Sequence, residues 1–340
     1  MKNIEKSVCF ILAIISMACS SSDDATVTAP VEAIPEEIAP VETLDFVNAE
    51  FVADMPVSQF NTSFVYDDKI YATAEDETYA FDIGSKTWSL LTTDTDTPKT
   101  TFDIGLNFIR DGKWYRLIRK GLFVFDFELN DWEVIKSFPL SDLIYSIQGY
   151  YVEAENAVYV LDQINRAEII YKYDLLTNEL MEHSTFDNNA GWYPIPENAF
   201  IINDTRYVAH LNDWEDMEIS KFNEDYTVFE TINVLETENY LDEGVACQFG
   251  DYIIFGLGGV PTGDANGNIT RDPSTLNFHY YNTITDTFGT MNTPFYESCR
   301  DAQLVSYNNE YYLIGGLTIT NNRTEFRSTI EKLQFEIIAP

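Results

Sequence analysis

The stretch YAFDIGSKTW, residues 79–88, begins as a strand, passes through a tight polar turn and enters a second strand. Its spacing returns along the chain: an aromatic residue, then Asp or Asn, and a second bulky apolar residue with six residues between the two. The complete copies are Phe81 to Trp88, Phe125 to Trp132, Tyr173 to Leu180, Phe222 to Phe229 and Tyr281 to Phe288, and an incomplete copy begins at Phe335. Successive copies lie 44 to 59 residues apart, the range expected of blade-type repeats.

A second hairpin pattern precedes each copy. It consists of an apolar strand, a polar turn and an aromatic strand, as in FVYDDKIYA (64–72) and FIRDGKWYR (108–116). Asp, Asn and Gly at the turns suit tight hairpins. Each unit is therefore four strands long, and no helical period is sustained after residue 44. Because one such sheet cannot bury both of its faces, the pattern predicts an all-β, six-bladed β-propeller over residues 44–340.

The repeats resemble those of the kelch family, which carries an aromatic and a Trp at this spacing and a Gly-Gly pair after the second strand. Gly315-Gly316 matches that pair, and Arg300 matches the family's Arg at the entry to the first strand. The other units depart from the family: the fifth keeps only Gly256, and Trp occurs only in the first two. The resemblance implies a kelch-like propeller, with a propeller of another family as the alternative.

The sixth unit lacks a fourth strand of its own. The segment DFVNAEFVADMP, residues 45–56, has strand character and ends in Met-Pro, as the outer strands before a following blade do in this fold. We expect it to supply the missing strand, since an open sheet edge is otherwise exposed. Deleting residues 44–56 should therefore destabilise the ring far more than deleting residues 20–43.

The N-terminal residues have the features of an export signal. Lys2 and Lys6 precede the apolar run VCFILAIISM (8–17), which is too short to span a bilayer. Ala18-Cys19 resembles the cleavage box of bacterial lipoproteins, which implies removal of residues 1–18 and lipidation of Cys19. The SSSDD after Cys19 resembles acidic signals that direct some lipoproteins to the outer face of the outer membrane. We expect a surface-facing outer-membrane lipoprotein, with an unlipidated secreted protein as the alternative.

Residues 19–43 are predicted to be a lipid-anchored tether, because they are rich in Ser, Pro, Ala and acidic residues without a helix or strand period. The whole chain has 56 acidic and 20 basic residues, a formal charge of −36. Such a surface repels phosphate, so a nucleic-acid partner is not expected. Contact with the membrane is expected through the lipid anchor only.

The loops between strands two and three lengthen along the chain. Tyr71 to Asp82 in the first unit is 11 positions, whereas Ile253 to Asn282 in the fifth is 29. In a kelch-type ring these loops and the blade-to-blade connections share one face, around the mouth of the central channel. Long loops on a rigid scaffold often build binding surfaces. The candidate ligand-binding residues there are Trp192, Tyr193, His210, Asp213, Trp214, Glu215, Tyr240, Tyr296 and Arg300.

Flat aromatic rings with carboxylates nearby suit stacking on sugars and hydrogen bonding to their hydroxyls. The alternative for these aromatics is packing between blades. The loop GDANGNITRD (263–272) is a second candidate, since oxygens of Asp264, Asn266, Asn268 and Asp272 could surround one Ca²⁺. A simple Asn-Gly turn is the alternative there. We therefore expect no cofactor, with Ca²⁺ left open.

Two cysteines lie in the propeller, Cys247 and Cys299. Aligned repeats place Cys247 level with Leu304 or Ser306 of the next unit, several residues from the level of Cys299. At ~3.3 Å per residue the gap is roughly 16 to 23 Å, beyond the ~7 Å that a disulfide allows. We expect two thiols.

Catalytic patterns are scarce. The three His residues show no metal-ligand spacing, and 56 acidic residues are too many to single out a catalytic pair. Two classes of function remain. The first is a monomeric, non-enzymatic lipoprotein that binds a glycan or an envelope protein through the mouth face. The second is a carbohydrate-active enzyme such as a sugar epimerase or mutarotase, for which six-bladed kelch sialic-acid mutarotases are the family precedent.

Anionic sugars would require clustered arginines at the mouth, and the sequence places only Arg300 and Arg271 there. This favours binding over catalysis, and a neutral glycan or a protein over an acidic sugar.

Overall fold

The computed structural model describes residues 42–94, 105–118, 120–137, 148–164, 167–187, 192–212, 216–225, 229–235, 244–258, 262–263, 269–270, 276–297, 299–320 and 323–339. The chain divides into two units, Met1–Pro40 and Val41–Pro340. The predicted signal peptide and nearly all of the predicted tether, including Cys19, lie outside the described residues. All the strands described belong to the second unit.

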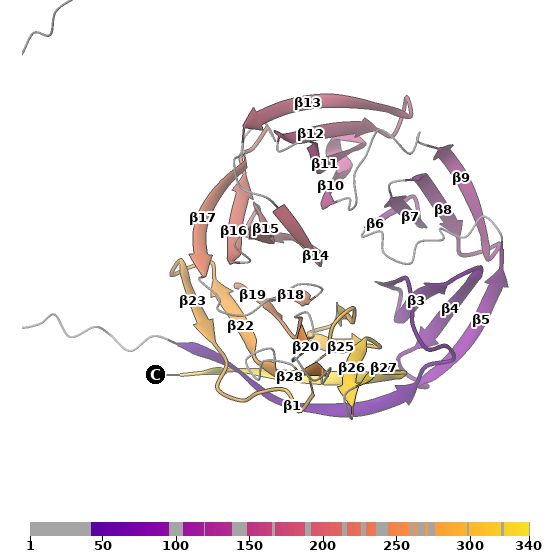
Figure 1. The fold of residues 1–340 in the computed structure, drawn as a ribbon. Coiled ribbons are helices and arrows are strands. Elements are labelled where there is room, and N and C mark those ends of the chain that lie inside the picture. Colours follow the sequence, from indigo (N-terminus) through magenta and orange to yellow (C-terminus); the bar gives the residue numbers. More distant parts are fainter. Residues whose placement is uncertain are drawn as a thin grey trace, which may run out of the picture. The chain divides into compact units, whose positions relative to one another are not determined.

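Six four-stranded antiparallel sheets are arranged as the blades of a propeller (Figure 1). The first three are β2 (Thr62–Tyr66), β3 (Lys69–Ala74), β4 (Glu77–Asp82) and β5 (Thr87–Thr93); β6 (Leu106–Arg110), β7 (Lys113–Ile118), β8 (Gly121–Asp126) and β9 (Asp131–Ser137); and β10 (Gln148–Val152), β11 (Ala157–Ile164), β12 (Ala167–Asp174) and β13 (Glu179–Asp187). A short 3₁₀ turn, η1 (Glu153–Glu155), joins β10 to β11.

The last three blades are β14 (Trp192–Ile202), β15 (Thr205–Asn212), β16 (Met217–Phe222) and β17 (Phe229–Leu235); β18 (Val245–Phe249), β19 (Tyr252–Gly256), β22 (Phe278–Asn282) and β23 (Thr287–Thr290); and β24 (Gln303–Tyr307), β25 (Glu310–Ile314), β28 (Thr329–Ile338) and β1 (Thr43–Asp54). Two small hairpins are inserted between second and third strands: β20 (Thr262–Gly263) with β21 (Ile269–Thr270), and β26 (Leu317–Thr320) with β27 (Arg323–Phe326). The predicted all-β, six-bladed fold is confirmed.

The recurring pair of bulky residues consists of cross-strand neighbours. Phe81 and Trp88 are register partners across β4 and β5, with ring centroids 5.1 Å apart. Phe125 and Trp132 repeat this pairing in the second blade at 5.2 Å. The same register joins the pairs of the third, fourth and fifth blades. The repeated spacing therefore sets the register of each outer hairpin, because directly opposed side chains are the contacts that stabilise paired strands.

The Asp that follows the first aromatic residue shapes the turn. In the first blade, the Asp82 carboxylate accepts a hydrogen bond of 2.7 Å from the Ser85 amide, and the Lys86 amide donates to the Asp82 carbonyl at 2.8 Å. Lys86 has a φ of +58°, and the residues at the same place in other blades, such as Asn130 and Asn178, also have positive φ. Asn tolerates this conformation better than Lys does, so the turn of the first blade is the more strained.

The ring is closed by the two ends of the described chain. Strand β1 pairs antiparallel with β28, from Thr43 opposite Ile338 to Asp54 opposite Thr329. Asp45 also accepts a hydrogen bond of 3.0 Å from the Thr293 amide, which lies in the connection after β23. The prediction that the 45–56 segment supplies the outer strand of the sixth blade is confirmed.

The buried apolar side chains of the described residues form six clusters, one at each interface between neighbouring blades. The cluster around Trp114, for example, joins the first blade to the second, and the cluster around Phe278 joins the fifth to the sixth. The cluster around Tyr312 joins the sixth blade to the first, so the series of interfaces is closed. Each sheet thus buries both faces against its neighbours, as the sequence argument requires.

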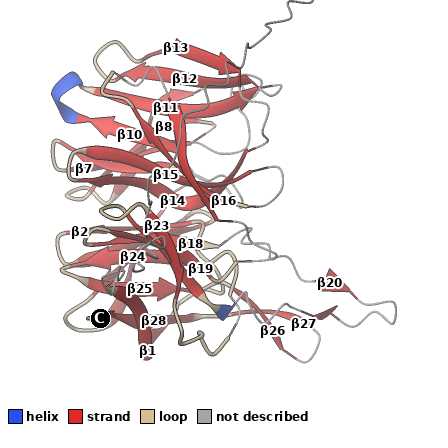
Figure 2. Cartoon of the chain, turned by 90° about the vertical axis from the view of Figure 1, so that its left-hand side faces the viewer, coloured by secondary structure: helices blue, strands red, loops and turns tan. Residues whose placement is uncertain are grey.

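Antiparallel pairing sorts the connections onto two faces. One face carries the connections from second to third strands and from blade to blade, and we call it the mouth face. The opposite face carries the remaining turns, and we call it the basal face. Hairpins β20–β21 and β26–β27 lie on the mouth side, opposite η1 (Figure 2). Cys247 and Cys299 are both buried and both are thiols, as predicted. Within the described residues, no helix is both long and apolar enough to cross a membrane.

Candidate functional site

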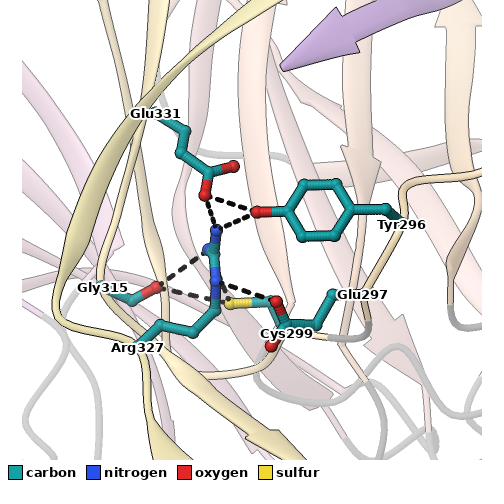
Figure 3. A network of polar contacts seen from close by, with 6 residues as sticks. All are labelled: Tyr296, Glu297, Cys299, Gly315, Arg327 and Glu331. Atoms are coloured by element: carbon teal, nitrogen blue, oxygen red, sulfur yellow. Dashed lines mark hydrogen bonds and ion pairs between the residues drawn. The ribbon is translucent and has the colours of Figure 1, made fainter. Parts of the chain in front are cut away.

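Among the described residues, the most developed polar cluster of the mouth face lies at the sixth blade (Figure 3). Its centre is Arg327, which follows hairpin β26–β27 and is 6% exposed. The guanidinium Nη2 donates to Glu331 Oε1 at 2.5 Å and to the Tyr296 hydroxyl oxygen at 2.8 Å. Its Nε lies 3.6 Å from the Glu297 carboxylate. The cluster therefore joins three segments of the chain. Tyr296 and Glu297 come from the connection between the fifth and sixth blades, Arg327 follows β27, and Glu331 lies near the start of β28.

These neighbours compensate for the burial of the charge. Burial alone would lower the pKa of the Arg327 guanidinium, but the adjacent Cys299, Glu331 and Tyr296 raise the pKa above its ordinary value. Burial and the hydrogen bond to Glu331 raise the pKa of the Tyr296 phenol. At neutral pH Arg327 is therefore charged, and Tyr296 is a protonated donor to the Glu331 carboxylate.

The Gly-Gly pair that the sequence singled out contributes to this cluster through the small size of Gly316 and through the backbone carbonyl of Gly315. Gly316 has a φ of +106°, and a Cβ there would come within 2.3 Å of Cys299 Sγ. The carbonyl of Gly315 accepts a hydrogen bond of 3.4 Å from the Cys299 thiol and another of 3.4 Å from Arg327 Nη1. Gly316 thus leaves room for the Cys299 thiol, because a side chain would fill that space, whereas a Cβ at Gly315 would lie 3.2 Å from the Met55 side chain.

Tyr296 differs from its partners because much of it faces solvent. The residue is 62% exposed, whereas Phe295 beside it is fully buried in the interface between the fifth and sixth blades. The two ring centroids are 4.4 Å apart. Phe326, the residue before Arg327, is also exposed, at 52%. The mouth face of the sixth blade therefore presents two aromatic side chains, one of which is held by its hydroxyl.

Arg300, another predicted site residue, is tied to the same hairpin. Its amide donates to the Leu317 carbonyl at 3.0 Å, and the Leu317 amide donates to the Arg300 carbonyl at 2.7 Å. Its Nε lies 3.9 Å from the Asp301 carboxylate. Arg300 and Tyr296 thus both lie at the sixth blade.

His210 lies in a second cluster, at the mouth end of the fourth blade. Its Nε2 is 3.0 Å from the Ser220 hydroxyl and 3.8 Å from Glu218 Oε2. Thr231 donates to the same Glu218 oxygen at 3.0 Å. The His210 side chain is only 1% exposed, so it lies inside the blade and not on the surface of the mouth.

A third cluster joins the first and second blades and contains an arginine that the sequence analysis missed. Arg116 is 1% exposed, and its Nη1 donates to Asn107 Oδ1 at 3.1 Å. Asn107 in turn donates to the Thr62 hydroxyl of the first blade at 3.2 Å. Arg116 and Arg327 thus lie near the mouth face, but both guanidinium groups are buried in contacts with the protein itself.

The remaining predicted site residues are not among the described residues of the three clusters above. Trp192 and Tyr193 are placed by their backbone at the mouth end of β14, opposite Asn212 and Leu211. Asp213, Trp214, Glu215 and Tyr240 lie outside the described residues, as do the predicted calcium ligands Asp264, Asn266, Asn268 and Asp272. Within the described part of the chain, no three His, Cys, Asp or Glu side chains gather as a metal site.

Fold and interfaces define the class of protein: a six-bladed β-propeller with its most elaborate connections on one face. No family model matches the chain, and no curated protein matches it. Among solved structures, one described as "Structure of YjhT" is similar, with a TM-score of 0.57 and 13% identity, over 81% of this chain and 99% of that chain. In all, 707 solved chains are similar to this one. Because the sequence identity to the structure named above is only 13%, the likeness shows the fold alone.

Proposed function

We propose that this protein is a lipoprotein of the cell envelope that binds a neutral glycan through the mouth face of its propeller. The observation that carries the proposal is Tyr296: an aromatic residue that is 62% exposed on the mouth face although its hydroxyl is hydrogen-bonded to a buried pair. Exposed aromatic rings stack on the apolar faces of sugar rings, and neighbouring carboxylates accept hydrogen bonds from sugar hydroxyls.

The charge distribution favours a neutral ligand. The chain has a net charge of −36, which repels an acidic polysaccharide. Arg116 and Arg327 lie near the mouth, yet both are buried and already bonded to Asn107 and to Glu331. These two arginines therefore do not offer the free guanidinium groups that recognise carboxylates.

The carbohydrate-active enzyme remains the alternative. Among the described residues, the histidine–carboxylate pair that could serve such an enzyme is His210 with Glu218, whose Nε2 and Oε2 atoms are 3.8 Å apart. The imidazole is enclosed and its Nε2 is bonded to Ser220, so a substrate would have to reach a group that is 1% exposed. The geometry therefore supports binding better than catalysis.

The finer classification and the location are proposals of the same kind. We propose that the repeats are kelch-like, on the Gly315-Gly316 pair and the aromatic spacing. We also propose that Cys19 carries the lipid and that the propeller faces the cell exterior, on the signal-like residues 1–18 and the acidic SSSDD after Cys19. Radiolabelled palmitate tests the anchor: wild type should incorporate it and Cys19→Ser should not. Equal labelling of both would contradict the anchor.

Affinity electrophoresis through gels that contain neutral polysaccharides tests the binding proposal. Wild type should be retarded by at least one polysaccharide, and Tyr296→Ala and Phe326→Ala should lose that retardation. Leu129→Ala and Leu176→Ala are matched controls, because these side chains are 74% and 69% exposed on basal turns. Equal retardation of all five proteins would place the binding elsewhere, and capture of an envelope protein without any retardation would support a protein partner instead.

A further inference from the structure

Tyr296 is held more firmly than an exposed side chain normally is. Its hydroxyl donates to Glu331 Oε1 and accepts from Arg327 Nη2, and the same guanidinium nitrogen also donates to Glu331 Oε1. Three polar groups thus form a closed triangle at the tip of the tyrosine ring. Figure 3 shows the hydroxyl of Tyr296 pointing toward Arg327 and Glu331.

The other two corners of the triangle are built into the fold. Arg327 is 6% exposed and Glu331 is 7% exposed. Glu331 lies in β28 opposite Phe51 of the closing strand and opposite Leu313 of β25, so its backbone is fixed by pairing on both sides. Arg327 is further held by Gly315 and by the carboxylate of Glu297. The backbone of Glu331 is therefore fixed by strand pairing, and Arg327 is fixed by its polar contacts, so the two side chains form a rigid anchor.

A contribution to stability does not by itself explain why an ion pair is buried at this position. Apolar residues of similar volume often stabilise a fold as well as or better than a buried salt bridge does. The pair is also placed at the edge of the core, where its hydrogen bonds end on an exposed aromatic side chain. That placement is what a ligand surface requires, because a side chain fixed before binding loses less conformational entropy on binding.

We propose that Arg327 and Glu331 are positioning residues that hold the Tyr296 ring as a fixed stacking surface for a neutral saccharide. This deepens the proposed function and rests on it. The ring supplies the stacking face, and Glu297, whose side chain is 29% exposed, supplies a carboxylate beside it that can accept a hydrogen bond from a sugar hydroxyl. Arg327 and Glu331 act through Tyr296 and do not themselves contact the sugar.

The anchoring can be tested without any ligand, through the reactivity of the phenol. N-acetylimidazole acetylates tyrosine at its oxygen, and peptide mass spectrometry of the full-length protein locates the modified residue. In wild type, Tyr296 should react more slowly than Tyr66, although Tyr66 is the less exposed of the two. In Glu331→Gln the rate at Tyr296 should rise about tenfold, because Arg327 would then stabilise the phenolate without a competing carboxylate. An unchanged rate would overturn the anchoring.

A second experiment measures how strongly each variant is retarded in gels that contain the polysaccharide that retards the wild-type protein. Tyr296→Phe keeps the ring and loses both hydrogen bonds, so its affinity should fall about five- to tenfold, whereas Tyr296→Ala should lose binding. Glu331→Gln should lose affinity to a similar degree as Tyr296→Phe. It should also lower the melting temperature, because the buried charge of Arg327 is left with one carboxylate fewer, so its affinity is measured well below its unfolding transition. Wild-type affinity in Tyr296→Phe would overturn the positioning role. If wild type binds no polysaccharide, the proposed function fails, while the acetylation rates still decide the anchoring.

Discussion

Phe46 is the side chain through which the closure of the ring can be perturbed with least change elsewhere. It lies on β1, is 4% exposed, and its ring centroid is 5.5 Å from Phe278, 5.7 Å from Phe295 and 5.9 Å from Phe335. These three rings belong to β22, to the connection before the sixth blade and to β28. Phe46→Ala would leave a cavity among all three, and such a truncation costs about 3–5 kcal/mol of unfolding free energy.

The control lies on the same strand. Phe51 is 57% exposed, so Phe51→Ala should change the unfolding free energy by less than about 1 kcal/mol. Urea unfolding followed by tryptophan fluorescence gives both values from the midpoint and the slope. If Phe46→Ala cost no more than Phe51→Ala, β1 would not be docked in the core, and the closure of the sixth blade would be wrong.

Three further changes test the fold and its electrostatics. Lys86→Asn should raise the unfolding free energy by about 0.5–1 kcal/mol in urea, because Asn tolerates the φ of +58° at that turn. Burial lowers the pKa of His279 from 6.5 to about 4, so, as the pH falls, this histidine is protonated in the unfolded chain before it is protonated in the folded protein. Stability measured by thermal melts should therefore fall between about pH 6.5 and 4, and His279→Gln should flatten this dependence. Gly316→Ala should lower the melting temperature more than Gly112→Ala, since only the former Cβ would meet Cys299.

Opposite results are equally informative. A destabilised Lys86→Asn would mean that the turn does not have its described conformation. An unaltered pH dependence in His279→Gln would assign the titration to another group. Equal effects of the two glycine substitutions would show that Gly316 is not in close contact with Cys299.

The fold was predictable because its determinants repeat. Phe81 and Trp88 oppose each other across one hairpin, so their spacing in the sequence is a direct result of strand register. The copies in four other blades carry the same information, and one segment of strand character remained to close the sixth blade. The strand that carries Phe46 was assigned to the sixth blade because the ring needed an outer strand there.

The candidate site was only partly predictable, because its residues come from connections that do not repeat. Tyr296 and Arg300 were expected on the mouth face from their position in the sequence. His210 was expected there too, and its side chain proves to be enclosed in the fourth blade. Arg327 and Glu331 were missed, since charged residues in an acidic chain are usually on the surface. One signal was present: in β28, Glu331 occupies the same alternating, inward-facing position as Leu333 and Phe335.

We propose that ligand binding occurs on the mouth face of the sixth blade. Hydrogen exchange of the full-length protein, with and without the polysaccharide that retards it, tests this claim directly. Binding should slow exchange at residues 293–297 and 323–327, and leave the basal turns at 83–86, 127–130 and 175–178 unchanged. Slower exchange confined to those basal turns would contradict the account.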